Sequence, residues 1–335
     1  MLNNNNSTVR DFKLRSTEDG IHLEGSILWL DAHKTKELSF LSTPTVRKNF
    51  TGPQFIATEE TIKILQINRK HPKALICQYN HPFALGKLKI ELLPSGSCLG
   101  SASLHIEAPK KQILYAPTLQ TQKINIVRKI QLREAETLIL EAFHPTPAKA
   151  LPSRKKEKER LLNQVEKELR QGKNPAILCN PIVTAQEITE LLSSYQIPVL
   201  VHPYIHRVNR VYESFGCKLG TYYSRSDSPT PHVRIIPYPF KNLPAVLNDN
   251  KTPFFLIDEK IGENLDPFDY FESDSSNRFV LSPVCDVKDL KEVIQKVNPN
   301  EIYVFGPYAN RYVQEMTSFT ANVKVLNPND QPSLF

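Results

Sequence analysis

Residues 92–104 restrict the possible folds of this chain more than any other part of the sequence. Apolar residues alternate with other residues on both sides of this stretch, at 88–92 and at 102–106. This is the period of a strand with one buried face. Gly96 and Gly100 allow tight backbone turns between the two strands. We therefore predict two strands joined by a turn in which backbone passes closely, at a point where a small site can lie.

Length and composition favour a soluble globular protein. The 335 residues are enough for two domains, or for one domain with a large insertion. The hydrophobic content of 40% and the charged content of 23% are typical of globular chains. A net charge of +7 permits contact with nucleic acid without showing it.

The cysteines predict an intracellular environment. They are scattered and never occur in C-x-x-C spacing, so we expect reduced, mostly packed thiols. The five residues are Cys77, Cys98, Cys179, Cys217 and Cys285. No apolar run approaches the roughly 18 residues that a membrane span requires, and the N-terminal residues lack the apolar core of a signal peptide. We therefore expect a cytoplasmic location and no membrane partner.

The spacing of apolar segments changes along the chain. Residues 8–117 predict mostly β-strands, with one short helix from Thr58. After a proline-containing linker at 145–148, a charged helix at 154–171 and a β-α-β-α pattern follow, and the α/β alternation resumes from Phe279. Neither G-x-G-x-x-G nor G-x-x-x-x-G-K-[ST] occurs, which argues against a dinucleotide or P-loop site.

Three local patterns carry further predictions. Ser153 is expected to cap the charged helix, whose basic first turns indicate either a solvated face or an edge that faces phosphates. The sequence from Thr184 to Glu187 predicts a capping box that begins a second helix. The acidic and aromatic residues 264–277 predict an exposed loop.

Eight stretches carry a resemblance to a known family in their order and spacing. They are Leu30-Asp31, Phe40–Ser42, Leu93–Ala102, Ile113–Tyr115, Leu138–Glu141, His202-Pro203 with 208–212, Leu281-Ser282 and Tyr303–Gly306. Together they resemble the β-CASP group of nucleases with the metallo-β-lactamase fold. They are most similar to the bacterial ligase-associated exonucleases, also described as messenger-RNA 3′-end processing factor-like proteins. The resemblance covers nearly the whole chain.

The resemblance implies an α/β fold in which helices and sheets are layered. The expected architecture is the four-layer αββα metallo-β-lactamase fold with an inserted α/β domain of the β-CASP type. The first part of the metallo-β-lactamase-like domain would span residues 1–147 and the inserted domain residues 148–277. A return segment at residues 278–335 would complete the first domain.

The chemistry of the family depends on two zinc or manganese ions held by histidine and aspartate side chains. The corresponding positions carry other residue types here. Thr43, Thr45, Arg47 and Lys48 stand in the H-x-H-x-D-H run, Ser97 and Thr118 stand for a third histidine and a bridging aspartate, Phe305 stands for the last ligand, and Val284 stands for an assisting histidine. The supporting carboxylates Asp31 and Glu141 are retained.

This ligand set implies a member without metal cofactors and without catalytic residues. Threonine, serine and phenylalanine side chains cannot hold two hard divalent cations. Arg47 and Lys48 would add positive charge to the pocket, where either can pair with Asp31 or Glu141.

Two classes of function remain open. The first is a catalytically degenerate homologue that acts as a non-catalytic partner or a nucleic-acid-binding subunit in DNA repair or RNA processing. In it, Thr43, Thr45, Arg47, Lys48 and Ser97 either bind a phosphate without metal or fill an inactive pocket. The alternative is an active metal-dependent nuclease, such as an exonuclease, with an altered metal site. The expected partners are DNA or RNA, an active nuclease, a ligase or a helicase, and a second subunit in a homo- or heterodimer.

Two other groups of residues have possible chemistry. His202 and His206 are spaced to hold a metal on one helix face, but Pro203 lies between them and surface or capping roles are favoured. Cys98 is a nucleophile only if a base lies beside it, and a packed thiol is favoured.

Overall fold

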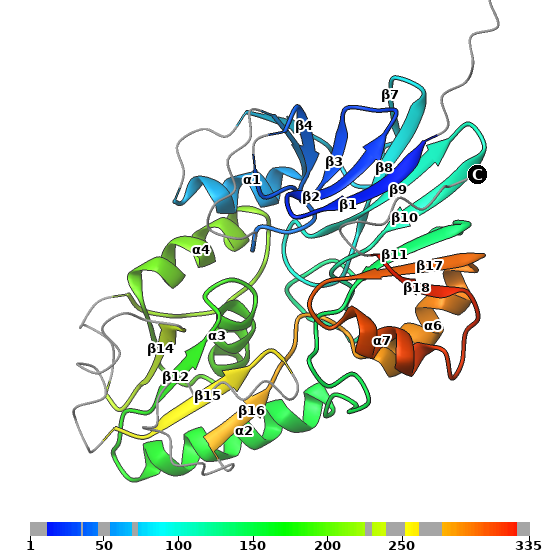
Figure 1. Ribbon diagram of the computed structural model, residues 1–335. Coiled ribbons are helices and arrows are strands. Elements are labelled where there is room, and N and C mark those ends of the chain that lie inside the picture. Colours follow the sequence, from blue (N-terminus) through cyan, green and yellow to red (C-terminus); the bar gives the residue numbers. More distant parts are fainter. Residues whose placement is uncertain are drawn as a thin grey trace, which may run out of the picture.

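Two facing sheets and a separate parallel sheet form the described part of the protein (Figure 1). The computed structural model describes residues 12–34, 36–45, 54–68, 73–224, 230–238, 252–260 and 277–326. Helices pack on the outer faces of the two facing sheets. The expected α/β class, with sheets and helices in layers, is confirmed.

The first sheet contains six strands, which lie side by side in sequence order. They are β1 (Lys13–Thr17), β2 (Gly20–Glu24), β3 (Leu28–Leu30), β4 (Leu38–Phe40), β5 (Phe55–Ala57) and β6 (Ala74–Ile76). β1 and β2 form an antiparallel hairpin, and β3 to β6 pair in parallel. Helix α1 (Glu59–Gln66) follows β5, and the Thr58 hydroxyl caps it by accepting the amide hydrogen of Thr61.

The second sheet contains seven strands, and it is completed only by the end of the chain. Its order is β18-β17-β11-β10-β9-β8-β7. The strands are β7 (Phe83–Leu85), β8 (Leu88–Pro94), β9 (Ala102–Ala108), β10 (Lys111–Tyr115), β11 (Thr137–Glu141), β17 (Glu301–Phe305) and β18 (Val323–Val325). The predicted strand pair around residues 92–104 is therefore confirmed as β8 and β9, which are antiparallel neighbours.

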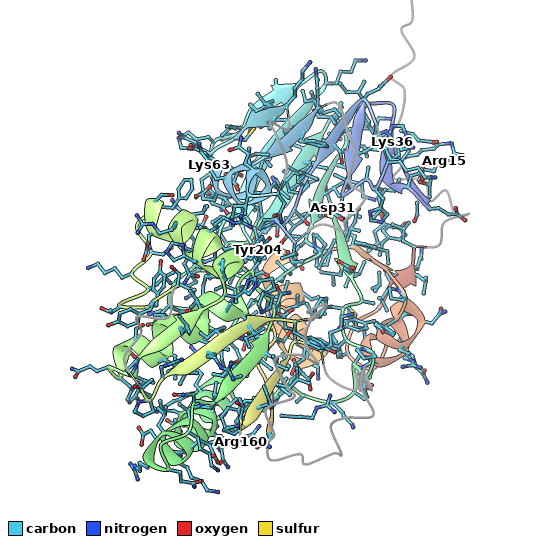
Figure 2. All side chains as sticks on the ribbon, turned by 90° about the vertical axis from the view of Figure 1, so that its left-hand side faces the viewer. Arg15, Asp31, Lys36, Lys63, Arg160 and Tyr204 are labelled. Atoms are coloured by element: carbon cyan, nitrogen blue, oxygen red, sulfur yellow. The ribbon has the colours of Figure 1, made fainter. Side chains whose placement is uncertain are left out.

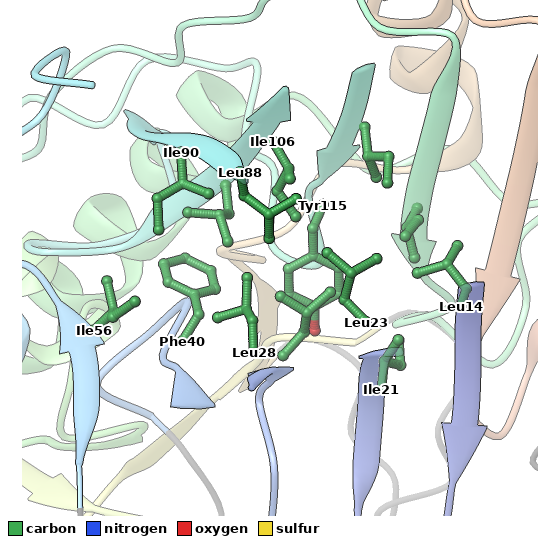
Figure 3. Packing of buried hydrophobic residues seen from close by; sticks show 14 of the residues in the cluster. Leu14, Ile21, Leu23, Leu28, Phe40, Ile56, Leu88, Ile90, Ile106 and Tyr115 are labelled. Atoms are coloured by element: carbon green, nitrogen blue, oxygen red, sulfur yellow. The ribbon is translucent and has the colours of Figure 1, made fainter. Parts of the chain in front are cut away.

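The main core lies between these two sheets (Figure 3). Leu14, Leu23 and Phe40 project from the first sheet, and Ile90 and Tyr115 project from the second. The side chains alternate along their strands, so one face of each sheet is removed from water. Burial of this apolar area is the main force that holds the sheets together.

Two helices cover the outer face of the second sheet. They are α6 (Val287–Val297), which is capped by the Asp286 carboxylate, and α7 (Ala309–Met316). Their buried residues, including Val293 and Met316, pack with Leu138 and Val304 of the sheet. On the opposite side, Ile62 of α1 packs with residues of the first sheet.

The third sheet is all parallel and has the order β13-β14-β12-β15-β16. Its strands are β12 (Ala176–Cys179), β13 (Val199–Val201), β14 (Val233–Pro237), β15 (Phe254–Asp258) and β16 (Arg278–Val280). Helices α2 (Arg154–Arg170), α3 (Thr184–Ser194) and α4 (Pro203–Ser214) belong with it. β16 pairs with β15, so this sheet runs slightly past position 277, and the proposed domain division stays a prediction. The loop predicted at 264–277 lies outside the described residues except for Asn277.

The two predicted helix caps differ in outcome. Ser153 is the residue before α2, as predicted, but its side chain makes no cap hydrogen bond. The predicted cap of α3 is wrong. Helix α3 is preceded by Val183 in a left-handed conformation, with φ of 81°, and the Gln186 side chain accepts the Val183 amide hydrogen. The capping position is therefore one residue earlier than predicted, and Glu187 is free for a different role.

An apolar joint holds the third sheet against the first two. Leu99 of the turn after β8 packs with Val208 and Tyr212 of α4 and with Ile64 of α1. The Tyr212 hydroxyl also accepts the amide hydrogen of Leu99 at 3.4 Å. In Figure 1, α4 accordingly lies directly beside α1.

The basic start of α2 has a role that neither sequence interpretation anticipated. Arg154 is buried and donates from Nε and Nη2 to both carboxylate oxygens of the buried Glu187, at 2.8 and 2.6 Å. Lys158 approaches the same carboxylate at 2.6 Å. Burial alone would raise the pKa of Glu187, but the hydrogen bonds and charges of these two cations outweigh it and lower the pKa. Lys155, in contrast, is exposed.

Within the described ranges, no helix combines the length and the apolar character needed to cross a lipid bilayer.

Replacing Glu187 by glutamine should destabilise the fold by about 3 kcal/mol at pH 7, because it leaves Arg154 buried without a counter-charge. The Glu187 pKa lies below its ordinary 4.5, so the stabilisation is complete above that pH and is lost as the pH falls through the lower folded pKa. Urea unfolding should therefore show the difference between wild type and Glu187→Gln narrowing below about pH 4.

Glu166→Gln is the matched control, because Glu166 pairs with Arg170 on an exposed face of α2, the helix that carries Arg154. It should change stability by less than about 0.5 kcal/mol. A Glu187→Gln protein as stable as this control at pH 7 would contradict the assignment.

Candidate functional site

The turn between β8 and β9 is rigid because it is hydrogen-bonded internally. The Ser101 hydroxyl accepts the Cys98 amide hydrogen and donates to the Cys98 carbonyl oxygen, and the Ser95 hydroxyl donates to Ser101 Oγ at 2.7 Å. Gly96 has φ of 80°, and a Cβ there would lie 2.3 Å from the Gln120 carbonyl oxygen. Glycine is therefore required at this close approach. Ser97 is 3% exposed within the turn.

A cavity of about 570 Å³ lies where parallel strands of the two facing sheets end. Six of the residues predicted from the resemblance line it: Asp31, Thr43, Thr45, Thr118, Glu141 and Phe305. They follow or end β3, β4, β10, β11 and β17. The cavity therefore collects residues that are far apart in the chain, as carboxyl edges of parallel strands commonly do. Figure 2 shows Asp31 near the middle of the molecule.

Both oxygens of the Asp31 carboxylate are engaged by the protein. Oδ1 accepts the amide hydrogen of Ser42 at 2.8 Å, and Oδ2 accepts the hydroxyl of Tyr115 at 2.8 Å. The residue has φ of 46°, a left-handed conformation that aspartate tolerates better than most residues. Burial raises the pKa of Asp31, although these hydrogen bonds oppose the rise. Asp31 thus joins the two sheets at the wall of the cavity.

Hydroxyl groups occupy the position after β4. Thr43 Oγ1 lies 3.0 Å from Thr45 Oγ1 and 3.6 Å from the Cys98 sulfur. Burial raises the pKa of the Cys98 thiol to about 11, so the nucleophilic thiolate is scarce at neutral pH. The packed-thiol interpretation of Cys98 agrees with this geometry.

Thr118 and Phe305 line another wall of the cavity. Thr118 is 9% exposed, and its hydroxyl has no hydrogen-bond partner among the described residues. Phe305 is half-buried, and its ring stacks on Tyr115 with the centroids 5.9 Å apart. A buried hydroxyl without a partner is uncommon, because an unsatisfied polar group costs free energy.

The donor atoms of this cavity do not fit a pair of zinc or manganese ions. Such sites need several imidazole nitrogens and uncommitted carboxylate oxygens. Here the corresponding positions supply threonine hydroxyls and a phenyl ring, and the Asp31 carboxylate already has two donors. Among the described residues, no group of three or more His, Cys, Asp or Glu side chains is placed to hold a metal ion.

The other predicted site residues lie elsewhere. Arg47 and Lys48 are outside the described residues, so their predicted pairing with Asp31 or Glu141 remains a prediction. Ser97 does not line the cavity. His202 caps α4, because its Nδ1 accepts the amide hydrogen of Tyr204 at 3.1 Å.

Sequence reasoning missed several cavity residues. His33, Phe143 and Asn310 also line the cavity, each shortly after a strand or at the start of α7. Their positions shortly after predicted strands were the only feature of the sequence that could have indicated them as site residues. It also missed Glu259, whose half-buried carboxylate accepts hydrogen bonds from Asn180 and Thr184 beyond the ends of β15 and β12. Burial raises the pKa of Glu259 to about 7.

Two curated proteins are similar to this chain in sequence. A protein of Opitutus terrae named "Probable DNA ligase" is 23% identical over 307 residues, which are 89% of this chain and 29% of that protein. An "RNase J-like protein" of Methanocaldococcus jannaschii is 24% identical over 137 residues, 38% of this chain and 32% of that protein. The chain thus spans about a third or less of the length of these relatives. No protein-family model matches the chain.

A solved structure supports the fold. A protein of unknown function from Enterococcus faecalis V583 superposes with a TM-score of 0.58 at 16% sequence identity. The match covers 89% of this chain and 81% of that protein. At this identity the likeness extends to the fold alone.

The orphan hydroxyl of Thr118 predicts an unusual stabilising substitution. Thr118→Val keeps the shape of the side chain and removes a buried group without a partner, so it should stabilise the protein by about 1 kcal/mol in chemical denaturation.

The matched control is Thr137→Val. The Thr137 hydroxyl is fully buried and donates to Glu301 Oε1 at 3.1 Å, so its removal should destabilise by about 1 kcal/mol. Equal losses in the two variants would show that Thr118 is not an orphan group.

Proposed function

We propose that this chain is a nucleic-acid-binding protein of a nucleic-acid-processing system. It would have the architecture of a metallo-β-lactamase-fold β-CASP nuclease but lack the metal ions and cleavage activity of such a nuclease. The names of the two curated relatives, a probable DNA ligase and an RNase J-like protein, support the processing context. The low identities leave substrate and reaction to be decided from the cavity itself.

The residues that line the cavity support the proposal that the protein does not cleave nucleic acid. Its walls meet at the strand ends where the resemblance places metal ligands, and they offer hydroxyl and phenyl groups there. The retained Asp31 carboxylate bonds to Ser42 and Tyr115 and stabilises the contact between sheets instead. The Cys98 thiol, which contacts the cavity residue Thr43, is protonated at neutral pH and so would not act as a nucleophile in place of a metal-bound water.

Two observations support the proposal that the chain binds nucleic acid: the position of Lys260 beside a cavity residue, and the basic residues that follow the cavity threonines in the sequence. The Lys260 ammonium lies 5.3 Å from the ring centroid of Phe143, which lines the cavity. Arg47 and Lys48 follow the two cavity threonines in sequence, and the proposal assigns them backbone phosphates of the ligand. The hydroxyls of Thr43 and Thr45 would donate to the same phosphates.

The proposed cellular role is that of a non-catalytic partner to an active enzyme. In the Opitutus terrae relative, the matching part makes up 29% of a protein named as a ligase, which favours a DNA ligase as the partner. The alternative partners are an active nuclease, a helicase, or a second subunit in a homo- or heterodimer. Co-purification from the native host would identify which of them binds.

Purified protein should contain no stoichiometric zinc or manganese and should not cleave single- or double-stranded DNA or RNA when manganese is supplied. Elemental analysis and a nuclease assay with labelled substrates measure both. Near-stoichiometric metal together with cleavage that Asp31→Ala abolishes would instead establish the alternative, an active nuclease with an altered metal site.

Nucleic-acid binding should be salt-dependent, because neutralised phosphates release counterions. In gel shifts at low salt, Arg47→Glu/Lys48→Glu should weaken binding about tenfold and reduce the salt slope by about 2. Lys260→Glu should act in the same direction. Lys167→Glu, an exposed position on α2 away from the cavity, is the control matched in charge to Lys260→Glu and should change binding little. If all three variants bind nucleic acid with equal affinity, the nucleic acid does not bind at the cavity.

A further inference from the structure

Two aromatic rings at the edge of the cavity lie near the same cation. The Lys260 ammonium is 5.3 Å from the ring centroid of Phe143 and 6.0 Å from that of Tyr308. Phe143 follows β11 and Tyr308 follows β17, so two paired strands of the second sheet bring both rings to one place. Phe143 lines the cavity, and so do Pro307 and Ala309 on either side of Tyr308.

A second cation lies near the Tyr308 ring. Arg311 is exposed in the first turn of α7, and its Cζ is 6.0 Å from the ring centroid of Tyr308. Its Nη1 donates to the Pro145 carbonyl oxygen at 2.6 Å. A carbonyl oxygen is neutral, so this bond orients the guanidinium and does not neutralise its charge. We call Phe143, Lys260, Tyr308 and Arg311 together the aromatic platform.

The two rings of the aromatic platform are held in place by their neighbours. The Phe143 ring packs edge-on against the imidazole of the buried His144, with the centroids 5.2 Å apart. The Tyr308 carbonyl oxygen accepts the amide hydrogens of Arg311 and Tyr312, which fixes the backbone at the start of α7. Both rings are half-buried, so part of each surface is open to a ligand. A ring that is already positioned loses little conformational entropy when a ligand stacks on it.

Rings flanked by cations match the chemistry of a single-stranded nucleic acid. Unpaired bases stack on aromatic side chains whatever their sequence, and cations beside the rings bind the backbone phosphates. The bases of a duplex are stacked between neighbouring base pairs, so their faces are not available to a protein ring. Phosphate contacts alone do not distinguish the two forms of nucleic acid in this way.

From this geometry we infer that the aromatic platform binds an unpaired base of a single-stranded DNA or RNA at the edge of the cavity. The base stacks on Tyr308, and Phe143 bounds the subsite on the side of the cavity. Lys260 and Arg311, which reach the ring from two different elements, bind the phosphates on either side of that base.

The strand then continues along the same cavity to the phosphate contacts proposed at Thr43 and Thr45, which line it. The assignment therefore rests on the proposed function. It adds a property that the phosphate contacts do not supply, a preference for unpaired strands.

Single strands and duplexes of one sequence, about 15 nucleotides long and made as DNA and as RNA, test the assignment by fluorescence anisotropy. The wild-type protein should bind the single strands about tenfold more tightly than the duplexes. Tyr308→Leu keeps an apolar side chain without a ring, so it should weaken single-strand binding about five- to tenfold and leave duplex binding unchanged. Tyr308→Phe keeps the ring and is the matched control, which should bind like the wild type.

The charge of the aromatic platform has a separate test. Arg311→Gln removes the charge and keeps a donor for the Pro145 carbonyl oxygen, so it should reduce the salt slope of single-strand binding by about 1. Arg170→Gln, which changes an exposed arginine on α2, is the matched control and should keep the wild-type slope. Thermal unfolding followed by circular dichroism should show that all four variants are folded.

The negative results have different meanings. If the wild-type protein binds both forms equally, or if Tyr308→Leu binds single strands like Tyr308→Phe, the stacking assignment is wrong and the nucleic-acid-binding proposal survives. The same holds if Tyr308→Leu weakens binding of single strands and duplexes alike, because a merely structural role would have that effect. If the wild-type protein binds none of the oligonucleotides at low salt, the proposed function fails and the stacking assignment fails with it.

Discussion

A buried ion pair between Arg154 and Glu187 begins a hydrogen-bonded path that links the third sheet to the second. The two side chains come from the first turns of α2 and α3, and Arg154 Nη1 also donates to the Ser282 carbonyl oxygen at 2.6 Å beyond the end of β16. Gln120 Nε2 donates to the same carbonyl oxygen, and the Gln120 amide donates to Ser95 in the rigid turn after β8. A continuous hydrogen-bonded path therefore runs from the third sheet to the rim of the second. Buried ion pairs add little net stability compared with apolar packing, but their directional bonds restrict how elements can be arranged.

The cavity shows how fold and chemistry can separate within one architecture. The strand ends that meet there are positioned by sheet pairing and by the core between the sheets, and neither requires a metal. Asp31 illustrates the point, because its carboxylate now bonds to Ser42 of the first sheet's loop and to Tyr115 of the second sheet. A carboxylate at these strand ends thus has a structural role here, and its presence alone says little about activity.

Much of the fold could be predicted from the sequence because apolar periodicity depends on local residues. Strands β8 and β9 have clear buried faces, and both appear close to their predicted bounds. The sequence did not predict β1 and β2 as two distinct strands, although buried and exposed residues alternate along both. Polar residues such as Ser16 occupy buried positions there and obscure the apolar pattern. The cap of α3 was displaced by one residue because the left-handed Val183 has no distinctive sequence signal.

The residues of the candidate site could be predicted only at the positions that the family resemblance named. Six of the expected residues do line one cavity, but local patterns could not reveal that Thr118 lacks a partner or that Phe143 lies beside Lys260. Such facts depend on contacts between strand ends that are distant in the chain. The basic start of α2 shows the same limit, because composition cannot distinguish an exposed cation from Arg154, whose counter-charge comes from another helix.

The pairing of β11 with β17 also constrains the order in which the protein can fold. These strands are direct neighbours, yet the whole of the third sheet lies between them in the chain. Closing so long a segment as an unstructured loop would cost considerable entropy, whereas a segment that has already folded, with its ends held near each other, costs less. During synthesis the seven-stranded sheet is completed only when its last two strands have been made, and until then β11 presents an open edge to incorrect partners.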